Sequence, residues 1–220
     1  MPYLVESVIA AGTWGSAPQP VIPAGCLRLR PWVPTDADVL VEAYADPAIQ
    51  QWHARSMTVP EAQEWIERKT RTWADETAAD WALEAGDRVV GRVGFRWLAL
   101  GDGCAEIAYW THPRARGEGH ARGAVRALTQ WAVGVGLHRI ELRHAVANTA
   151  SCRVAEACGY RHEGTAISAM LHGDGWHDMH VHGFVAPPAT GEGGRSPPPS
   201  PRSRQAVRTQ RPRPPCWKRA

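Results

Sequence analysis

The sequence predicts a mixed α/β fold, in which a mostly antiparallel sheet of about seven strands carries helices on both faces. Three observations lead to this prediction. The hydrophobic period alternates between that of a strand and that of a helix, in the order β-α-α-β-β-β-α-β-α-β-β. Three consecutive strands are separated by short turns, which join antiparallel neighbours. A long amphipathic helix in the middle of the chain has an apolar face that can cover a sheet.

The composition is that of a soluble globular protein: 44% of the 220 residues are hydrophobic and 21% are charged. The five cysteines are odd in number and include no Cys-x-x-Cys pair, which argues against a disulfide framework and a zinc knuckle. The apolar residues 3–11 contain Glu6 and follow no basic residue, unlike a secretory signal, and no run is long enough to span a bilayer. We therefore expect a cytoplasmic protein with no membrane partner.

The charge is unevenly distributed along the chain. Residues 187–220 hold eight Arg or Lys residues and one acidic residue, which gives this segment a net charge of +7. Because the whole chain has a net charge of +3, residues 1–186 have a net charge of −4. Half of the 18 prolines also lie there, which predicts a disordered Pro/Arg-rich basic tail. Such a tail can bind polyanions weakly, but we expect no specific nucleic-acid partner. Residues 1–25, rich in Gly, Ala and Pro, predict a flexible leader, so that the folded domain is expected at 26–186.

The first half of the domain starts with a strand at 27–30, where apolar and charged residues alternate. Pro31 and Pro34 end this strand, and Thr35 or Asp36 can cap a helix that runs to residue 46. A capping box from Thr58 to Glu61 predicts a second helix, as far as about residue 78. Three strands follow, at 81–85, 89–98 and 105–111, with turn residues between them.

The second half starts with a glycine-containing turn at 113–122. It leads into a helix from about Gly119 to Gly136, whose apolar residues recur at helical spacing. A strand is predicted at 138–146, and Asn148 or Thr149 can cap a short helix that ends near residue 158. Two strands, at 160–162 and 177–184, complete the domain.

The turn at 113–122 is the main candidate for a binding site. Gly117 and Gly119 stand between a strand and a helix, where glycine allows a sharp turn that directs successive N–H groups toward one point. Unpaired N–H groups and the dipole at a helix N-terminus favour a bound anion. A lone Gly-x-Gly is more often an ordinary solvated loop, and a P-loop is excluded because no Gly-Lys-Ser/Thr follows the glycines.

A second motif narrows the interpretation. Residues 114–119 read Arg-Ala-Arg-Gly-Glu-Gly, and Asn148 precedes Ser151 and the pair Gly159-Tyr160. With these two motifs the chain resembles the GNAT N-acetyltransferases, from Leu27 to Phe184. Within the family it looks most like the ribosomal-protein N-terminal acetyltransferase branch (RimJ/RimL-type), because of Asp46-Pro47, the strand 106–110, and His112-Pro113.

The resemblance implies a GNAT-like sheet that is splayed between the fourth and fifth strands, 104–111 and 138–146, and acetyl-CoA as co-substrate. Backbone N–H groups of 116–121 would bind the pyrophosphate, while the strand residues at 109–111 would pair with pantetheine. The cofactor-binding residues that it implies are Tyr109, Trp110, Thr111, Arg114, Arg116, Gly117, Glu118, Gly119, His120, Ala121, Asn148 and Ser151.

For catalysis, the resemblance implies direct attack of a primary amine on the thioester, with no metal. Glu106 is the predicted base, although a carboxylate that balances a nearby Arg would look the same; Glu163 is a weaker candidate. Ala155 stands where many members have the tyrosine that protonates the leaving thiolate. Ser151 is therefore the predicted acid, its alternative being an ordinary first-turn helix serine. Asn148 can likewise hold pantetheine or only cap its helix.

Several alternatives stay open. The acceptor is a protein N-terminal amine or a small-molecule amine, and the protein acts as a monomer or a homodimer. A catalytically inactive acyl-CoA-binding sensor or interaction module is the alternative function. Tryptophans at 52, 65, 73 and 176 can line an acceptor pocket or belong to the core. Asp178, His180 and His182 share one strand face at a spacing that can hold a metal, but no third or fourth ligand is evident, and no metal site is predicted.

Overall fold

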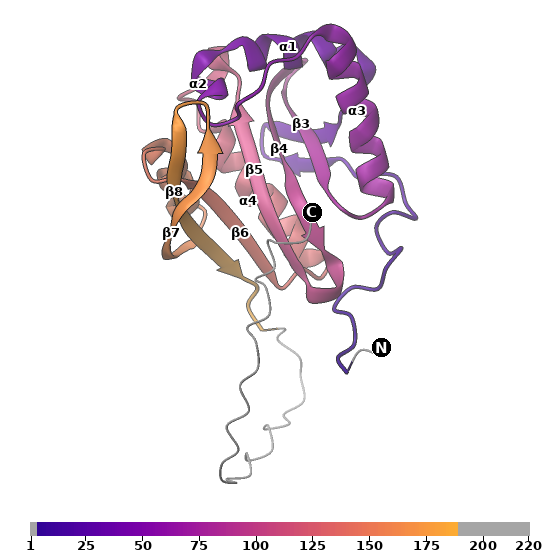
Figure 1. Cartoon of the computed structure of the whole chain (residues 1–220). Coiled ribbons are helices and arrows are strands. Elements are labelled where there is room, and N and C mark those ends of the chain that lie inside the picture. Colours follow the sequence, from indigo (N-terminus) through magenta and orange to yellow (C-terminus); the bar gives the residue numbers. More distant parts are fainter. Residues whose placement is uncertain (1–3, 189–220) are drawn as a thin grey trace. The chain divides into compact units, whose positions relative to one another are not determined.

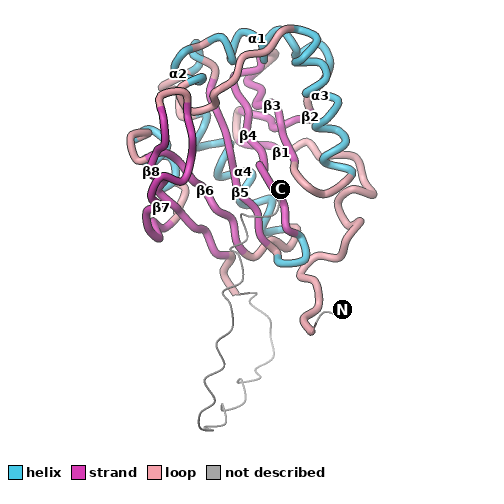
Figure 2. Tube along the Cα trace, viewed as in Figure 1, coloured by secondary structure: helices cyan, strands magenta, loops and turns pink. Residues whose placement is uncertain are grey.

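The structure of the protein is a computed structural model, in which residues 4–188 are described (Figures 1 and 2). One compact unit extends to Ala186. Its strands are β1 (Ile22–Ala24), β2 (Leu27–Pro31), β3 (Ala79–Ala85), β4 (Arg88–Ala99), β5 (Cys104–Thr111), β6 (Arg139–Ala145), β7 (Arg161–His172) and β8 (Gly175–Val185). Its helices are α1 (Ala37–Ala45), α2 (Pro47–Gln50), α3 (Val59–Ala74), α4 (His120–Gly134) and α5 (Thr149–Ala157), with short 3-10 turns at Pro34–Asp36, Leu100–Asp102 and Pro113–Ala115.

All of these strands form one sheet in the order β1-β2-β3-β4-β5-β6-β8-β7. Every neighbouring pair is antiparallel except β5 and β6, which are parallel. This parallel pair is joined only from Cys104, opposite Arg139, to Ile107, opposite Leu142. β5 stays paired with β4 as far as Thr111, so that the two parallel strands separate over their second halves. The predicted mixed, mostly antiparallel sheet and its splay are confirmed.

Helices cover the sheet on two faces, because alternate strand residues point to opposite sides. Ile107 of β5 belongs to the larger apolar cluster, which includes Val125 and Leu128 of α4. Trp110 of β5 belongs to a second cluster with Leu40 of α1 and Trp65 of α3. The predicted capping box of α3 is present: the N–H of Thr58 donates to the carboxylate of Glu61, and the N–H of Glu61 donates to the hydroxyl oxygen of Thr58. No helix within residues 4–188 is long and apolar enough to cross a bilayer.

The leader predicted at 1–25 requires a correction, because its described part is packed on the domain. Ile9, Trp14 and Ile22 are buried. The indole of Trp14 stacks on that of Trp73 with ring centroids 6.0 Å apart. Backbone N–H groups of residues 12, 14 and 15 donate to the carboxylate of Glu76 at 2.6–2.9 Å, and β1 adds an eighth strand beside β2. The domain therefore starts before residue 26. Except for Pro187 and Pro188, the predicted tail lies outside the described residues.

The strand predicted at 160–162 is also too short. β7 continues to His172 and forms a long hairpin with β8. The sequence of β7 hides this, because the strand lies at the edge of the sheet and is mostly exposed. Two register shifts, beside Gly164 and near Ser168, further break its alternation.

Candidate active site

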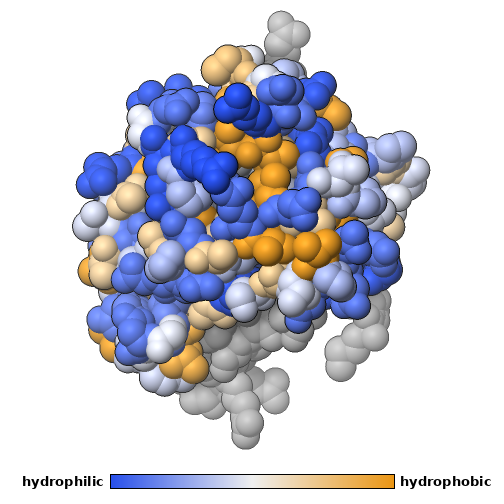
Figure 3. All heavy atoms as spheres, turned by 90° about the horizontal axis from the view of Figure 1, so that it is seen from above, coloured by the Kyte–Doolittle hydropathy of each residue, from blue (hydrophilic) through white to orange (hydrophobic). Residues whose placement is uncertain are grey.

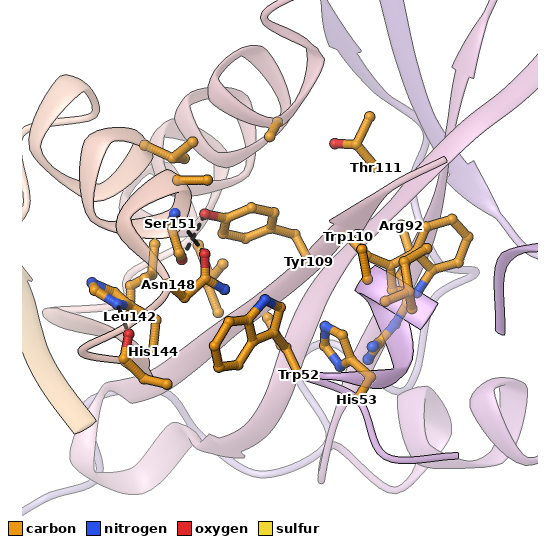
Figure 4. A pocket seen from close by; sticks show the side chains of 18 of the residues that line it. Trp52, His53, Arg92, Tyr109, Trp110, Thr111, Leu142, His144, Asn148 and Ser151 are labelled. Atoms are coloured by element: carbon orange, nitrogen blue, oxygen red, sulfur yellow. Dashed lines mark hydrogen bonds between the residues drawn. The ribbon is translucent and has the colours of Figure 1, made fainter. Parts of the chain in front are cut away.

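A cavity of about 760 Å³ lies where β5 and β6 separate. Its walls come from the second halves of these strands, the glycine turn before α4, the start of α5, the segment 48–55 around the end of α2, and the tip of the β7–β8 hairpin. Figure 4 shows side chains from several of these elements converging on one space. Of the predicted site residues, Glu106, Tyr109, Trp110, Thr111, Arg116, Gly117, Gly119, His120, Ala121, Asn148 and Ser151 line it.

The glycine turn has the geometry predicted for an anion site. Gly117 and Gly119 have φ values of 84° and 77°, in the left-handed region that other residues rarely adopt. Gly119 is the N-cap of α4 and has no side chain to satisfy the first N–H groups of the helix. The turn therefore leaves helix N–H donors available for an anion at the cavity wall.

The two arginines of the turn are engaged in ion pairs. The guanidinium of Arg114 lies 2.5 Å from a carboxylate oxygen of Glu42 in α1. Arg116 lies 2.7 Å from Asp46, the N-cap of α2, and this hydrogen bond lowers the pKa of the Asp46 carboxyl. These pairs fasten the first helices to the turn. Arg114 and Glu118 do not line the main cavity, and Glu118 lies on a second depression with Arg122 and Arg153, between the starts of α4 and α5.

Two hydroxyl groups meet at the centre of the cavity wall. Oγ of Ser151 lies 2.8 Å from the phenolic oxygen of Tyr109, and Figure 4 shows the two side chains pointing toward one another. Burial raises the pKa of Tyr109, an effect that the bond to Ser151 partly offsets, so that the phenol is protonated at neutral pH. Asn148 caps α5 by accepting the N–H of Ser151 at 3.1 Å. The sequence predicted both residues as part of the site but not their contact with each other. Tyr109 lies one strand period after Ile107 on the same face of β5.

The carboxylate of Glu106 is buried and lines the same cavity. One oxygen accepts a hydrogen bond from the indole N–H of Trp97 at 2.8 Å, and the other lies 3.6 Å from the guanidinium of Arg96. The group is therefore held in place and partly balanced, yet it faces the cavity. Glu163 is instead paired with Arg139 on an exposed part of the sheet and does not line the cavity.

Sequence reasoning missed a charged cluster of which two members, Lys69 and Arg92, line the cavity. Asp80 is fully buried and pairs with Arg92 and with Lys69, at 2.5 Å from the latter. Both cations also lie over the ring of Trp65, at 5.5 Å and 5.0 Å from its centroid. These residues are far apart in the sequence and come together only because β3, β4 and α3 are neighbours.

The aromatic residues divide between cavity and core. Trp52 and Trp65 line the cavity, whereas Trp73 packs against Trp81 in the core and Trp176 is exposed.

His53, which follows Trp52 in the cavity wall, has a low pKa. Burial and the nearby charge of Arg92 lower the pKa of His53 to about 4. Seen from the side of α1 and α2, apolar side chains form a band among hydrophilic ones (Figure 3).

Comparisons with known proteins agree with this geometry. Residues 27–161 match the acetyltransferase (GNAT) domain family. An uncharacterized N-acetyltransferase, p20 of Bacillus licheniformis, is 28% identical over 143 residues, which are 63% of this chain and 80% of that protein.

Two solved structures show the same fold. One is RimL, a ribosomal L7/L12 α-N-protein acetyltransferase in complex with coenzyme A: its TM-score is 0.70 at 20% identity, over 76% of this chain and 98% of that one. The other is the microcin C7 self-immunity acetyltransferase MccE in complex with acetyl-CoA and AMP: its TM-score is 0.67 at 21% identity, over 72% of this chain and 92% of that one.

The splayed sheet and the matching domain define an acetyl-CoA-dependent acyltransferase. More particularly, the chain belongs to the GNAT acetyltransferase family, with acetyl-CoA as its co-substrate.

Proposed function

We propose that the protein moves an acetyl group from acetyl-CoA to a primary amine by direct attack, with Ser151 and Tyr109 as a paired acid and Glu106 as the base. The observation that carries this proposal is the 2.8 Å contact between the two hydroxyl groups in the wall of a cavity that Glu106 also lines. The pair takes the place of the tyrosine that is absent at Ala155.

In the proposed complex, the glycine turn binds the pyrophosphate through the N–H groups of 116–121. The depression that holds Arg122 and Arg153 offers two cations for a further phosphate of the coenzyme. Pantetheine then follows β5 along Tyr109 to Thr111, in place of the strand pairing that β6 gives up. A backbone N–H near Trp110 polarises the thioester carbonyl.

The chemical step needs three proton transfers. Glu106 removes a proton from the ammonium form of the acceptor, directly or through water, and the free amine attacks the thioester carbon. The C–S bond then breaks, and the leaving thiolate takes a proton from the Ser151–Tyr109 pair. The attacking nitrogen loses its second proton to solvent as the amide forms, and the pair takes a proton back from solvent. Deprotonation at neutral pH costs about 1–1.5 kcal/mol for an α-amino group and about 4.6 kcal/mol for a lysine. A single weak carboxylate base therefore suits an α-amino acceptor best.

The acceptor is proposed to be a protein N-terminal amine, with small-molecule amines as the second class. The fold likeness to ribosomal-protein acetyltransferases supports the first class. Acetyl-CoA should be incubated with peptides that carry a free or a blocked N-terminus and with small amines, while thiol release and the mass of the acceptor are followed. Thiol release matched by one added acetyl group on the free N-terminus is the expected result. Acetyl-CoA binding with no thiol release from any acceptor would instead identify an inactive binding module.

A further inference from the structure

Three histidines and a cysteine meet beside the cavity, and one of them, His144, also lines it. His144 comes from β6, Cys152 from α5, and His180 and His182 from β8. One donor atom of each lies within 4.8 Å of the donor atoms of the others. The register of β6 and β8 creates this cluster, because His144 stands opposite His180, and His182 is two residues further along the same face. Asp178, which the sequence grouped with these histidines, instead accepts the N–H of Ser168 at 2.8 Å.

The spacing of the donor atoms is close to that around a tetrahedral metal ion. Nε2 of His144 lies 3.1 Å from Nε2 of His182, and Sγ of Cys152 lies 4.0 Å from the latter atom. A tetrahedral zinc ion has bonds of about 2.0–2.1 Å to nitrogen and about 2.3 Å to sulfur, which place two nitrogens about 3.4 Å apart and nitrogen and sulfur about 3.6 Å apart. All four donor atoms lie within 4.8 Å of one another, so that shifts of about 1 Å would complete the site.

The hydrogen bonding of His144 favours coordination. Its Nδ1 lies 2.8 Å from the carbonyl oxygen of Ala145, so that Nδ1 carries the hydrogen and Nε2 presents its lone pair to the cluster. A ring nitrogen that donates to a backbone carbonyl is the usual second contact of a metal-bound histidine.

Two of the four ligands lie in the interior. His182 is fully buried and His144 nearly so. Their facing Nε2 atoms are therefore shielded from solvent, as in a closed structural metal site.

We propose that His144, Cys152, His180 and His182 bind one Zn²⁺ ion that fastens the start of α5 to β6 and β8. Three imidazoles and one thiolate suit zinc, and four protein ligands leave no open position, as in a structural site. Binding would release the proton of the Cys152 thiol to solvent and leave a zinc thiolate. With no open position, the ion would make no bond to either substrate.

Cobalt(II) is the probe of choice, because its spectrum reports both geometry and sulfur ligation. The full chain is purified without a histidine tag, stripped with a chelator and titrated with Co²⁺ alone. We expect one Co²⁺ per chain, the intense visible absorption of a tetrahedral site and a thiolate-to-cobalt charge-transfer band, all abolished by one equivalent of Zn²⁺. A folded protein with no charge-transfer band or without saturable binding would overturn the proposal.

Matched variants locate the site. Cys152→Ser should abolish the charge-transfer band, and His180→Gln should weaken Co²⁺ binding at least about 100-fold. The controls Cys26→Ser, at an exposed thiol, and His177→Gln, on the same strand but paired with Asp174, should leave both unchanged. Equal binding by Cys152→Ser and Cys26→Ser would place the ion elsewhere and overturn the proposal.

A thermal readout covers variants that bind no cobalt. Zn²⁺ at about 100 times its Kd should raise the Tm of the unaltered chain by about 5–10 °C. The same concentration should leave the Tm of Cys152→Ser unchanged, even if that variant is less stable without metal. An equal rise in both proteins would also contradict the proposal.

Discussion

Removal of the Ser151 hydroxyl should slow acetyl transfer without weakening acetyl-CoA binding. Ser151→Ala deletes the oxygen 2.8 Å from the phenol of Tyr109 but keeps the N–H that Asn148 caps, so that α5 retains its start. The effect should therefore fall on the proton that the leaving thiolate needs rather than on the shape of the cavity. The KM for acetyl-CoA should stay within about twofold of its original value.

The size of the effect follows from the leaving group. A positioned acid contributes about 10²–10⁴-fold, and a thiol with a pKa of about 8.5 leaves readily, which places this case at the low end. We expect kcat to fall about 100-fold. Because the half-buried phenol loses its partner, the free energy of unfolding should also fall, by about 1 kcal/mol.

A double-mutant cycle separates a shared role from two independent ones. If the hydroxyls act as one unit, then Tyr109→Phe should lower kcat about as much as Ser151→Ala, and the double variant should be no slower than either. Initial rates of thiol release at saturating acetyl-CoA provide the assay, and urea unfolding provides the stability. Thr149→Ala, an exposed residue in the same first turn, is the control and should change neither quantity. A Ser151→Ala enzyme with normal kcat, or effects that multiply in the double variant, would refute the paired acid.

Three further predictions concern the glycine turn, the base and an ion pair. Gly119→Ala should lower the free energy of unfolding by about 1–2 kcal/mol, because the φ of 77° at this residue is strained for alanine. It should also raise the KM for acetyl-CoA at least tenfold. The control Gly134→Ala adds a methyl group at the other end of α4, where it meets no atom within 4 Å, and should leave this KM unchanged. Glu106→Gln should lower kcat about 100-fold in the thiol-release assay with unchanged acetyl-CoA affinity, whereas Glu141→Gln, whose carboxylate pairs with Arg139, should not. Because the bond to Arg116 lowers the pKa of Asp46, its stabilising effect is complete above a pH of about 4 and is lost as the pH falls through the lowered pKa. Asp46→Asn should therefore lower the free energy of urea unfolding by about 0.2–1 kcal/mol at pH 7, with a difference that shrinks below pH 4; a difference independent of pH would contradict the ion pair.

Local signals in the sequence predicted the elements that depend on neighbouring residues. The capping box at Thr58, the glycines that end or begin helices, and the alternation of β5 all act within a few residues, so that each is legible in the sequence. The same holds for the glycine turn. It also holds for Asn148 and Ser151, which lie three residues apart at the start of α5.

Long-range partners could not be predicted in this way. Trp14 is buried only because Trp73 and Trp131 stand beside it, and nothing near residue 14 in the sequence reveals them. For the same reason, the leader was expected to be separate from the domain. The charged group at Asp80 and the contact between Ser151 and Tyr109 were not predicted, because each depends on contacts between distant strands and helices.

The histidine cluster illustrates the same limit and also explains how α5 can serve two sites. From the sequence, His180 and His182 lacked further ligands, because His144 and Cys152 come from other elements. Successive helix residues point about 100° apart, so that Ser151 and Cys152 face different surroundings from one turn of α5. Ser151 reaches Tyr109 in the cavity wall, while Cys152 reaches the histidines of the sheet. Since both contacts fix the same first turn of α5, the position of the proposed acid depends on how firmly the cluster behind it holds that turn.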